Sequence, residues 1–384
     1  MIPGRRTYLV TGARAPGTLE IIRRLGRAGH TVLAADCVRA PVGRFSRYVR
    51  RYFQVPAPRT DHAGFAAALR KIAQGEGVDT LLPTCEEIYT VARHRGILAE
   101  VCSVFCADLD VLIRVHHKER FARLTYELGG PVVAPESVLV ETTAQRRALA
   151  SESQRWVFKP VYSRFAARTL VCPSSDRVNA LTLDPANPWL AQRFAPGREL
   201  SSYGIAVRGR LTAHSVYHSR HRAGQGAGVY FVSEENAAVR GFVERIVTHL
   251  GFTGQIGFDF IVCAATGNVF VLECNPRLTS GIHLFAPDFD LDGALRGMAG
   301  GVAPSQPKML GTAMLTHALR TGNRRAWWRD FSTADDVIAA RDDPLPMLGQ
   351  LAFLAEMGGR AIGRRTGIIA AMTADIEWNG ETHS

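Results

Sequence analysis

Lysine is scarce in this sequence, although the chain is strongly basic. Only four of its 46 basic residues are lysines (Lys71, Lys118, Lys159 and Lys308), and the formal net charge is +11. An arginine guanidinium is a planar fork, whereas a lysine ammonium is a compact point charge, so the two are not interchangeable. A lysine that persists in so arginine-rich a chain therefore indicates a task for a point charge, such as contact with a phosphate group.

Other features are missing too, and each absence excludes a class of protein. No run of about 18 apolar residues occurs, so we expect no membrane span. The first residues lack an apolar core of signal-peptide length. The seven cysteines are scattered without zinc-site spacing, which is typical of free thiols in a cytoplasmic protein. With no internal repeat or low-complexity segment, the sequence predicts a globular cytoplasmic protein of two or three packed units in 384 residues.

The positive charge is spread along the whole chain. A basic stripe, a recognition helix or an aromatic platform would indicate nucleic-acid binding, and the sequence shows none of these. An anionic nucleotide and an anionic substrate explain part of the excess charge as well. We therefore expect no nucleic-acid partner, and nucleic-acid binding stays a third hypothesis that depends on the net charge alone.

The most informative stretch is residues 254–281. Its segments 255–262 and 269–275 alternate between apolar and polar side chains, as strands with one buried face do. Gly267 and Asn268 between them suit the unusual dihedral angles of a hairpin turn. The stretch therefore predicts a β-hairpin. We expect its apolar side chains to share one face: Ile256, Phe258, Phe260, Val262, Phe270, Leu272 and Cys274.

Three oxygen-bearing side chains are expected on the other face of this hairpin. Folding it about the middle of the turn puts Val262 opposite Phe270 and Asp259 opposite Glu273, and Asn275 shares the face of Glu273. Two opposed carboxylates repel each other unless a cation lies between them. Hard oxygen ligands of this kind suit Mg²⁺, with Mn²⁺ as an alternative ion. The other interpretation is the solvated polar face of an ordinary hairpin.

The run E-C-N-P-R at residues 273–277 favours the metal site, because Arg277 is suited to grip a phosphoryl group. This hairpin resembles that of the ATP-grasp superfamily, and most nearly the ATP-grasp unit of the large subunit of carbamoyl-phosphate synthases. The similarity extends in order over residues 5–290. It implies that Asp259, Glu273 and Asn275 bind Mg²⁺ and that Arg277 contacts the transferred phosphate.

The first part of the chain predicts an open parallel sheet. Strands are expected at residues 7–11, 31–36, 52–55, 78–82 and 101–107, with helices at 18–28 and 61–74. The first strand, helix and second strand look like a dinucleotide fold that ends in Asp36. The loop between Gly12 and Gly17, however, has the spacing G-x-x-x-x-G and contains Pro16, so a simple tight turn is the alternative. The family resemblance implies a domain that frames the substrate instead.

Glu86 follows the predicted strand at residues 78–82. Ligands bind at the carboxyl ends of strands in open α/β sheets, so Glu86 is a candidate contact for a substrate amine. The alternative is a favourable interaction with the dipole of the following helix.

Two of the four lysines fall where the resemblance implies contacts to ATP phosphates. Lys118 lies in a predicted amphipathic helix, where a solvated charge would be the ordinary interpretation. Lys159 lies in the apolar strand at residues 156–160, where an ammonium needs an anionic partner. The resemblance implies that Lys159 contacts the α- and β-phosphates and takes part in catalysis.

The loop at residues 161–168 departs from the family pattern. The corresponding loop in many ATP-grasp enzymes is rich in glycine and closes over the phosphates, whereas this one contains no glycine. Ser163 is expected to donate to the phosphates, and Arg164 and Arg168 supply charge in the place of backbone amides.

A strand predicted at residues 189–194 resembles the ATP-grasp hinge that holds adenine. The resemblance implies that Gln192 contacts the adenine amino group, helped by the backbone of Arg193, Phe194 and Ala195. Glu199 is expected to accept hydrogen bonds from the ribose hydroxyls, since one carboxylate can accept from both. A surface acid at the start of a strand is the alternative for Glu199.

A hairpin is expected from strands at residues 200–207 and 210–217, followed by a mobile cationic loop at residues 218–228. Arg220 and Arg222 in this loop are candidates for contact with a carboxylate substrate or the triphosphate. An exposed basic turn is the alternative. His283 is a further candidate for the substrate site, with simple packing as its alternative.

These observations predict an α/β fold, with α+β units in the ATP-grasp part. The expected divisions are an N-terminal open, Rossmann-like parallel sheet at residues 1–112, a first ATP-grasp subdomain at 113–195, a second with the metal hairpin at 196–300, and a C-terminal region at 301–384 that packs on the ATP-grasp domain.

The resemblance implies an ATP- and Mg²⁺-dependent ligase that joins a small or amino-acid-like carboxylate to an amine through an acyl phosphate. Alternatives are a carboxylate–thiol ligase and a nucleotide-binding protein without turnover, which the glycine-free loop favours. The expected partners are small molecules, without a membrane or a nucleic acid, and the protein is expected as a monomer or homodimer.

Overall fold

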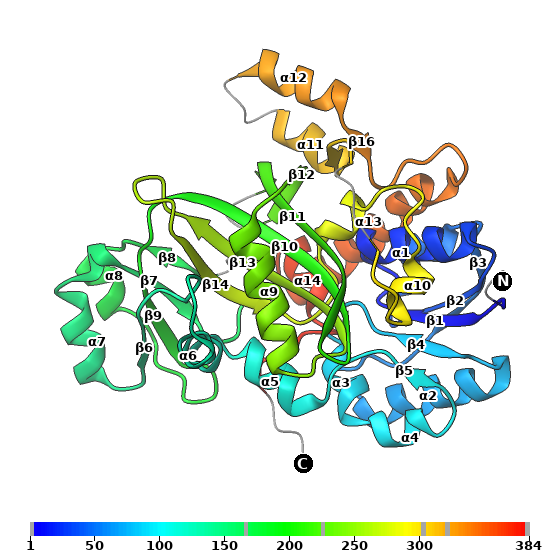
Figure 1. The fold of residues 1–384 in the computed structure, drawn as a ribbon, viewed down its shortest axis with the longest axis horizontal. Helices are drawn as coiled ribbons and strands as arrows, with labels where there is room; N and C mark the ends of the chain where they lie inside the picture. Colours follow the sequence, from blue (N-terminus) through cyan, green and yellow to red (C-terminus); the bar gives the residue numbers. More distant parts are fainter. Residues whose placement is uncertain (1–3, 165–167, 224–226, 301–304, 319–322, 381–384) are drawn as a thin grey trace.

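A computed structural model describes residues 4–164, 168–223, 227–300, 305–318 and 323–380. Its first sheet is parallel, and the strands lie in the order β3 (Val49–Gln54), β2 (Thr31–Asp36), β1 (Thr7–Thr11), β4 (Thr80–Leu82) and β5 (Ser103–Val104). The accompanying helices are α1 (Pro16–Arg27), α2 (His62–Glu76), α3 (Ile88–Arg93) and α4 (Arg95–Ala99), with the 3₁₀ turn η1 (Val42–Phe45). The predicted open parallel sheet is therefore confirmed (Figure 1).

Strand β5 is shorter than the predicted strand at residues 101–107. The backbone amides of Val101 and Cys102 still bond to Leu98, so these residues finish a helical turn instead of joining the sheet. Only Ser103 and Val104 pair with β4.

The second sheet is antiparallel and has the order β6 (Ser137–Val140), β9 (Trp189–Arg193), β7 (Trp156–Pro160) and β8 (Leu170–Val171). Helices α5 (Leu109–His116) and α6 (Lys118–Leu128) lead into it, and it is accompanied by α7 (Thr143–Ala150), η2 (Ser153–Arg155) and α8 (Ser175–Asn179). Its small core centres on the buried rings of Trp156, Phe158 and Trp189. The core holds β7 and β9 side by side, which fixes the positions of Lys159 and Gln192.

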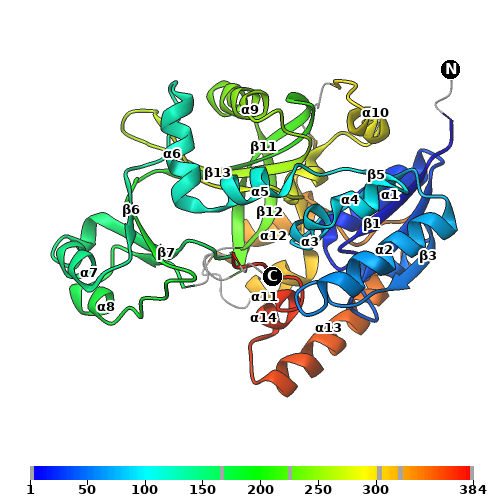
Figure 2. The ribbon, with the colours of Figure 1, turned by 90° about the horizontal axis from the view of Figure 1, so that it is seen from below.

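The third sheet has the order β14 (Val269–Asn275), β13 (Gly254–Val262), β10 (Arg198–Val207), β11 (Arg210–Ala223), β12 (Ala227–Glu234), β15 (Lys308–Met309) and β16 (Asp335–Asp336). Helix α9 (Ala237–His249) lies across it, as Figures 1 and 2 show. The ring of Phe242 on α9 meets Phe258 and Phe260 edge-on at 5.5 and 5.8 Å, and Phe121 on α6 stacks on Phe258 at 6.0 Å. One face of the β13–β14 hairpin is thereby covered by α6 and α9, and the other face carries the polar side chains.

The hairpin has a β-bulge that the alternation of side chains did not predict. Val262 pairs with Val269, not with Phe270, and a register shift between Asp259 and Phe260 restores the predicted pair of Asp259 with Glu273. The extra residue reverses the alternation on β14. Val269, Val271 and Cys274 are therefore the buried side chains, and the predicted inward positions of Phe270 and Leu272 are wrong.

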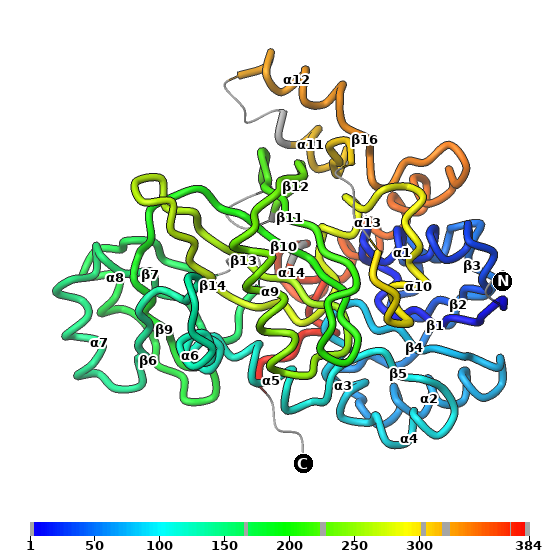
Figure 3. The backbone as a smooth tube through the Cα atoms, viewed as in Figure 1, coloured from blue at the N-terminus to red at the C-terminus, as the bar shows by residue number. Residues whose placement is uncertain are grey.

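The last part of the chain contacts two sheets. It contains α11 (Gly311–Ala318), α12 (Arg324–Thr333), α13 (Leu345–Arg364) and α14 (Ile368–Thr373), preceded by η3 (Ser280–Leu284) and α10 (Leu291–Leu295). Strands β15 and β16 extend the third sheet, whereas α13 packs against η1 in a core that includes Leu19, Val42, Phe353 and Met357. The tube in Figure 3 follows the chain from α14 back to α3 and α5. The predicted domain bounds stay a prediction. None of the helices in the described part of the chain is long and apolar enough to cross a membrane.

Candidate active site

The polar face of the β13–β14 hairpin brings together the three side chains predicted to bind a metal. Asp259 and Glu273 are paired directly across the two strands. The amide of Asn275 donates a 3.1 Å hydrogen bond to Asp259 Oδ2, and the hydroxyl of Ser201 on β10 donates one of 2.7 Å to Asp259 Oδ1. Two donors therefore fix Asp259 in a position that faces Glu273.

The two carboxylates differ in their electrostatics. The loss of water around Asp259, together with the charge of Glu273, raises the pKa of Asp259 above its ordinary value. The loss of water around Glu273 acts in the same direction, but the ammonium groups of Lys118 and Lys159 bring the pKa of Glu273 well below its ordinary value. Nearby positive charges thus balance the negative charge of Asp259 less than that of Glu273, and a cation at this face would stabilise the ionised form of Asp259.

Lys118 connects the start of α6 to the hairpin. Its Nζ lies 3.3 Å from Glu273 Oε2 and donates to the carbonyl oxygens of Val161 at 3.2 Å and Ser163 at 3.3 Å. Only 3% of its side chain is exposed, so it is not a solvated helix charge. The ammonium therefore connects the loop after β7 to the β13–β14 hairpin.

Lys159 joins the second sheet to the third. From β7 its Nζ donates to Gln192 Oε1 on β9 at 3.0 Å and to the carbonyl of Leu272 at 3.3 Å. Leu272 is the extra residue at the bulge, so the bulge exposes a carbonyl that an unbroken ladder would have used. Burial lowers the pKa of Lys159 to about 8; the nearby Glu273 opposes this shift, and Lys118 adds to it. The positive charge of this ammonium is incompletely balanced by its neighbours, and a phosphate would supply the missing negative charge.

The donor set fits a hard divalent cation such as Mg²⁺. It consists of two carboxylates and an amide oxygen beside two ammonium groups. In the described residues no three His, Cys, Asp or Glu side chains gather into a metal site by themselves. A cation here would thus take further ligands from outside the chain, as Mg²⁺ does when it is held by one or two carboxylates and substrate phosphates.

Arg277 and Glu86 lie next to this face. Arg277 Nη2 is 3.3 Å from Asn275 Oδ1, and its Nε is 3.7 Å from Glu86 Oε1. Glu86 is 4% exposed and forms ion pairs with Arg164 through both carboxylate oxygens. Burial would raise the pKa of Glu86, but Arg164 and Arg277 bring it down to about 2. Glu86 is therefore ionised and held between arginines.

The predicted adenine hinge lies beside Lys159. Gln192 is buried, with its carbonyl oxygen on Lys159 and its amide nitrogen 3.2 Å from Ser137 Oγ. The guanidinium of Arg193 covers the ring of Trp156 at 5.3 Å. Phe194, with 41% of its surface exposed, and half-buried Ala195 continue outward from β9. The backbone beyond Gln192 is the part of this segment that remains accessible.

Ser163 contributes to the site through its backbone. Its carbonyl accepts from Lys118, whereas its hydroxyl donates to the carbonyl of Pro160 at 3.3 Å. Residues 165–167 of the same loop lie outside the described residues, so its predicted closure stays a prediction.

Glu199 and Arg222, predicted for ribose and substrate, form an ion pair with each other near the start of β10 and the end of β11. Arg220 instead pairs with Asp330 on α12 at 2.8 Å. The predicted loop at residues 218–228 is wrong for 218–223, which continue β11, and for 227–228, which begin β12. Two register shifts let the pairing continue past Ser219; residues 224–226 are not described.

His283 lies in η3, where its ring stacks on Phe231 at 6.4 Å. Burial lowers the pKa of His283 to about 4, so the ring is neutral near pH 7. Within the described part of the chain, neither His283 nor Arg220 forms a hydrogen bond or ion pair with the hairpin carboxylates.

Two contributors were missed by the sequence reasoning. Ser201 reaches Asp259 only because β10 pairs with β13, and no local pattern announces this contact. Trp378 donates its backbone N–H to Glu86, close to the end of the chain. The run D-I-E-W-N-G at residues 375–380 was a signal of folded structure there, but nothing in it pointed to the active site.

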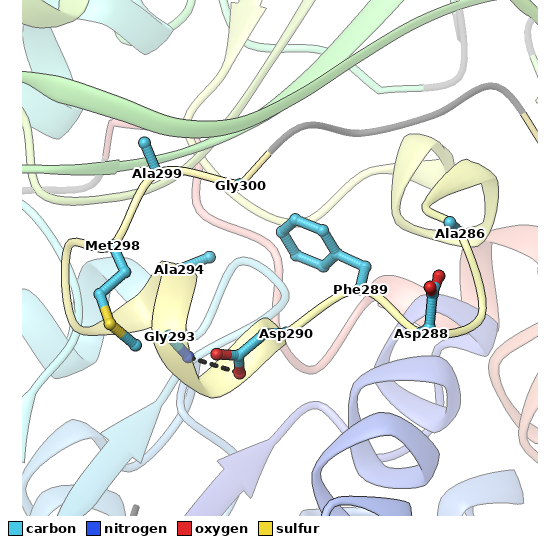
Figure 4. A pocket seen from close by; sticks show the side chains of 9 residues that line it. All are labelled: Ala286, Asp288, Phe289, Asp290, Gly293, Ala294, Met298, Ala299 and Gly300. Atoms are coloured by element: carbon cyan, nitrogen blue, oxygen red, sulfur yellow. Dashed lines mark hydrogen bonds between the residues drawn. The ribbon is translucent and has the colours of Figure 1, made fainter. Parts of the chain in front are cut away.

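A hollow of about 290 Å³ lies between the end of η3 and α10 (Figure 4). Asp288, Phe289 and Met298 are among its lining residues, and Asp290 accepts a 2.8 Å hydrogen bond from the amide of Gly293 at the start of α10. None of the candidate site residues lines this hollow.

Comparison with known proteins gives a consistent result. Residues 123–281 match the family model of the ATP-grasp domain. A search of curated proteins finds no match to this sequence. Among solved structures, an L-amino acid ligase from Bacillus licheniformis superposes with a TM-score of 0.59 at 15% identity, over 79% of this chain and 78% of the ligase.

Two other solved structures contain a bound nucleotide. The ADP complex of N5-carboxyaminoimidazole synthetase from Staphylococcus aureus has a TM-score of 0.63 at 14% identity, with 82% of this chain and 86% of that one covered. The biotin carboxylase domain dimer of 2-oxoglutarate carboxylase from Hydrogenobacter thermophilus, in complex with MgADP, ADP and bicarbonate, has a TM-score of 0.60 at 12% identity, with coverage of 79% and 73%. At these identities the similarity establishes the shared fold.

Proposed function

Because this chain contains an ATP-grasp domain and belongs to the ATP-grasp superfamily, we propose that it is an ATP-dependent ligase that joins a carboxylate to an amine. The observation that supports this most directly is the meeting of Asp259 and Glu273 with Lys118 and Lys159 from another sheet and helix. Opposed carboxylates beside two buried ammonium groups suit a metal–nucleotide complex.

The proposed reaction has two steps. A carboxylate oxygen of the substrate attacks the γ-phosphorus of ATP, the bond to the bridging oxygen breaks, and ADP leaves. The amine nitrogen then attacks the acyl carbon of the acyl phosphate, phosphate leaves, and the nitrogen loses a proton. Neither step requires a covalent intermediate on the protein, so catalysis consists of positioning and charge stabilisation.

Each residue has a proposed task in these steps. Asp259, Glu273 and Asn275 would hold Mg²⁺, which when bound neutralises charge on the phosphates. Lys118 and Lys159 hold the nucleotide phosphates, and Arg277 grips the transferred phosphoryl group. Lys159, already engaged with Gln192, is well placed to connect the phosphates to the hinge for adenine.

The remaining predicted roles are proposed with them. The backbone of Arg193, Phe194 and Ala195 would contact adenine, Glu199 the ribose, and Ser163 the phosphates through its loop. The proposed substrates are a small or amino-acid-like carboxylate and an amine, with Glu86 on the side of the substrate. We propose a cytoplasmic location and either a monomer or a homodimer.

The decisive experiment measures ADP and phosphate release from ATP and Mg²⁺ with pooled amino acids and small amines. We expect release that depends on the pool, and a loss of at least about 100-fold in Glu273→Ala, as removal of a key electrostatic group commonly causes. Glu244→Ala is the matched control, because Glu244 is an exposed acid whose ion pair is with Arg240, one helical turn away. Equal rates in Glu273→Ala and the control would contradict the proposed site.

The glycine-free loop favours a second candidate, a nucleotide-binding protein without ligation. Tight binding of Mg²⁺–ATP with no turnover in any substrate pool would select it. A carboxylate–thiol ligase would instead release ADP only when thiols replace amines in the pool.

A further inference from the structure

The C-terminal segment, residues 375–380, lies against the candidate active site. The indole of Trp378 stacks on Tyr89 of α3, with ring centroids 4.5 Å apart and an angle of 20° between the planes. Tyr162, from the loop after β7, meets the indole edge-on at 5.2 Å, and His116 at the end of α5 lies 6.1 Å away. The segment thus packs between α3 beside the first sheet and the loop after β7.

The backbone of this segment completes the surroundings of Glu86. The N–H of Trp378 donates to Glu86 Oε2 at 3.2 Å. Arg164, which holds the same carboxylate, donates to the carbonyl of Trp378 at 2.6 Å and to Asn379 Oδ1 at 3.1 Å. Glu86 is in turn 3.7 Å from Arg277. One network therefore joins the end of the chain to the arginine proposed to grip phosphate.

The segment is anchored from its other side as well. Asp375 forms ion pairs with Arg14 at 2.5 Å and with Arg360 at 2.8 Å, and Glu377 lies 3.2 Å from Arg59. Both Arg14 and Arg59 belong to the first sheet and its loops. These anchors hold the segment in place by protein contacts alone, so it can act as a fixed part of the site.

Loss of the contacts of the C-terminal segment would destabilise the protein, because the segment provides hydrogen-bond partners for buried charges. Glu86 and Arg164 are 5% and 9% exposed at their side chains, and buried charges need their hydrogen-bond partners to keep one geometry. Within the described residues, Trp378 Nε1 and His116 Nε2 are buried without a hydrogen-bond partner. Buried polar atoms without a partner are uncommon in folded proteins.

We propose that the C-terminal segment completes the active site, with Trp378 as a positioning residue that fixes Glu86 and Arg164 and thereby the orientation of Arg277. The inference rests on the proposed function for the role of Arg277 alone. The indole of Trp378 stacks on Tyr89 and so holds the backbone of Trp378 in place. In that position its N–H donates to Glu86 and its carbonyl accepts from Arg164. The segment acts on the part of the site around Arg277 and Glu86, where the phosphoryl group and the substrate are proposed to bind, and not on the adenine hinge.

The first experiment compares Trp378→Ala with Trp378→Phe in the full chain by amide hydrogen exchange. Trp378→Ala should speed amide exchange about tenfold or more at residues 84–89 and 161–164, because the free energy of local opening falls when the C-terminal segment no longer packs there. Trp378→Phe keeps a stacking ring and should stay close to the wild type. Unchanged exchange in Trp378→Ala, or equal loss in Trp378→Phe, would overturn the proposal.

A second variant moves the segment without deleting a side chain. A Cβ at Gly380 would lie 2.4 Å from the ring of Tyr162, where the backbone φ is +84°. Gly29→Ala is the matched control, since Gly29 has φ +85° and open space around its Cβ position. Gly380→Ala should reproduce the exchange of Trp378→Ala, and Gly29→Ala should not; identical behaviour of the two glycine variants would overturn the proposal.

Steady-state kinetics distinguish a positioning role of Trp378 from a purely structural one, because only the positioning role changes kcat without changing KM for ATP. In Trp378→Ala we expect kcat to fall about tenfold or more while KM for ATP stays within about twofold, with recovery in Trp378→Phe. A rise in KM for ATP with kcat unchanged would overturn the assignment. If the wild-type protein releases no ADP with any pool, the proposed function fails, and the exchange measurements still decide for or against the segment.

Discussion

Two regions of this protein look like nucleotide sites in the sequence, and they differ in how their charges are satisfied. At the β1–α1 loop, Asp36 ends β2 as in a dinucleotide fold, yet Arg14 of the same loop holds it through its backbone N–H at 2.9 Å and its guanidinium. Arg14 also binds Asp375 from the C-terminal segment. At the β13–β14 hairpin, by contrast, Asp259 faces a second carboxylate, Glu273.

The difference shows how structural charges can be told from functional ones. A buried charge whose partners all come from the chain stabilises one arrangement and needs no ligand. A pair of like charges held face to face by the fold is stabilised by a further cation; burial, together with the charge of Glu273, raises the pKa of Asp259. The N-terminal loop is thus a structural anchor, and the hairpin is the stronger candidate for a ligand site.

The largest expected effect is the loss of the structural anchor. Arg14→Leu leaves Asp36 and Asp375 buried without their shared cation, so we expect the free energy of unfolding to fall by about 3–5 kcal/mol. Arg27→Leu, at the end of α1, removes an exposed pair with Asp342 and should cost about 0–1 kcal/mol. Denaturant unfolding of both variants measures the difference, and equal losses would remove the contrast between the two regions.

The next effect concerns Lys159 and nucleotide affinity. Burial lowers its pKa to about 8, so the ammonium loses its charge as pH rises above that value. The affinity for ADP should therefore decline between pH 7 and 9, by at most about tenfold per pH unit. Lys159→Arg should flatten this profile, since arginine keeps its charge, and Lys71→Arg at an exposed position should not. Calorimetric titration at three pH values tests this; equal slopes in all three proteins would contradict it.

The smallest effect concerns the stability of the metal-free protein. Because the pKa of Asp259 is raised in the folded state, folding favours its protonated form. The contribution of protonated Asp259 to the free energy of unfolding is therefore lost as pH rises from the ordinary pKa of 3.8 through the raised pKa. We expect the Tm to decline over this window by a few degrees, or about 0.5–1 kcal/mol for two opposed carboxylates. Added Mg²⁺ should reduce the decline, and Glu273→Gln should show a smaller decline, because burial still raises the pKa of Asp259 when the charge of Glu273 is removed. A decline of unchanged size in Glu273→Gln would contradict a contribution from the opposed carboxylate.

The sequence predicted most of the hairpin, and the reason is local. Alternation and the turn residues set the two strands, and the pair of Asp259 with Glu273 followed from counting across the turn. The same counting failed at Val262 and Phe270, because a bulge has no local signature strong enough to shift the register. The correct pair and the incorrect one came from the same argument, and the bulge lies between them.

Other parts of the site could not be predicted. Arg220 and Arg222 read as a loop, but continued pairing with β12 extends the strand and directs Arg220 to Asp330. The contact of Glu86 with Arg164 and Trp378 joins segments that are far apart in the chain. No periodicity or spacing encodes such a meeting, because it depends on how three separate elements pack.

The sequence by itself determined the parallel sheet, the β13–β14 hairpin with its opposed acids and the two lysines that stand out among arginines. Strand alternation, turn chemistry and the different charges of lysine and arginine act over a few residues, so they can be read from the chain. Only the tertiary structure decided which acids are paired and which remain opposed, and that residues 375–380 return to the candidate active site. The physical reason is that the energy of a charge depends on its neighbours in space, and these neighbours come from distant segments.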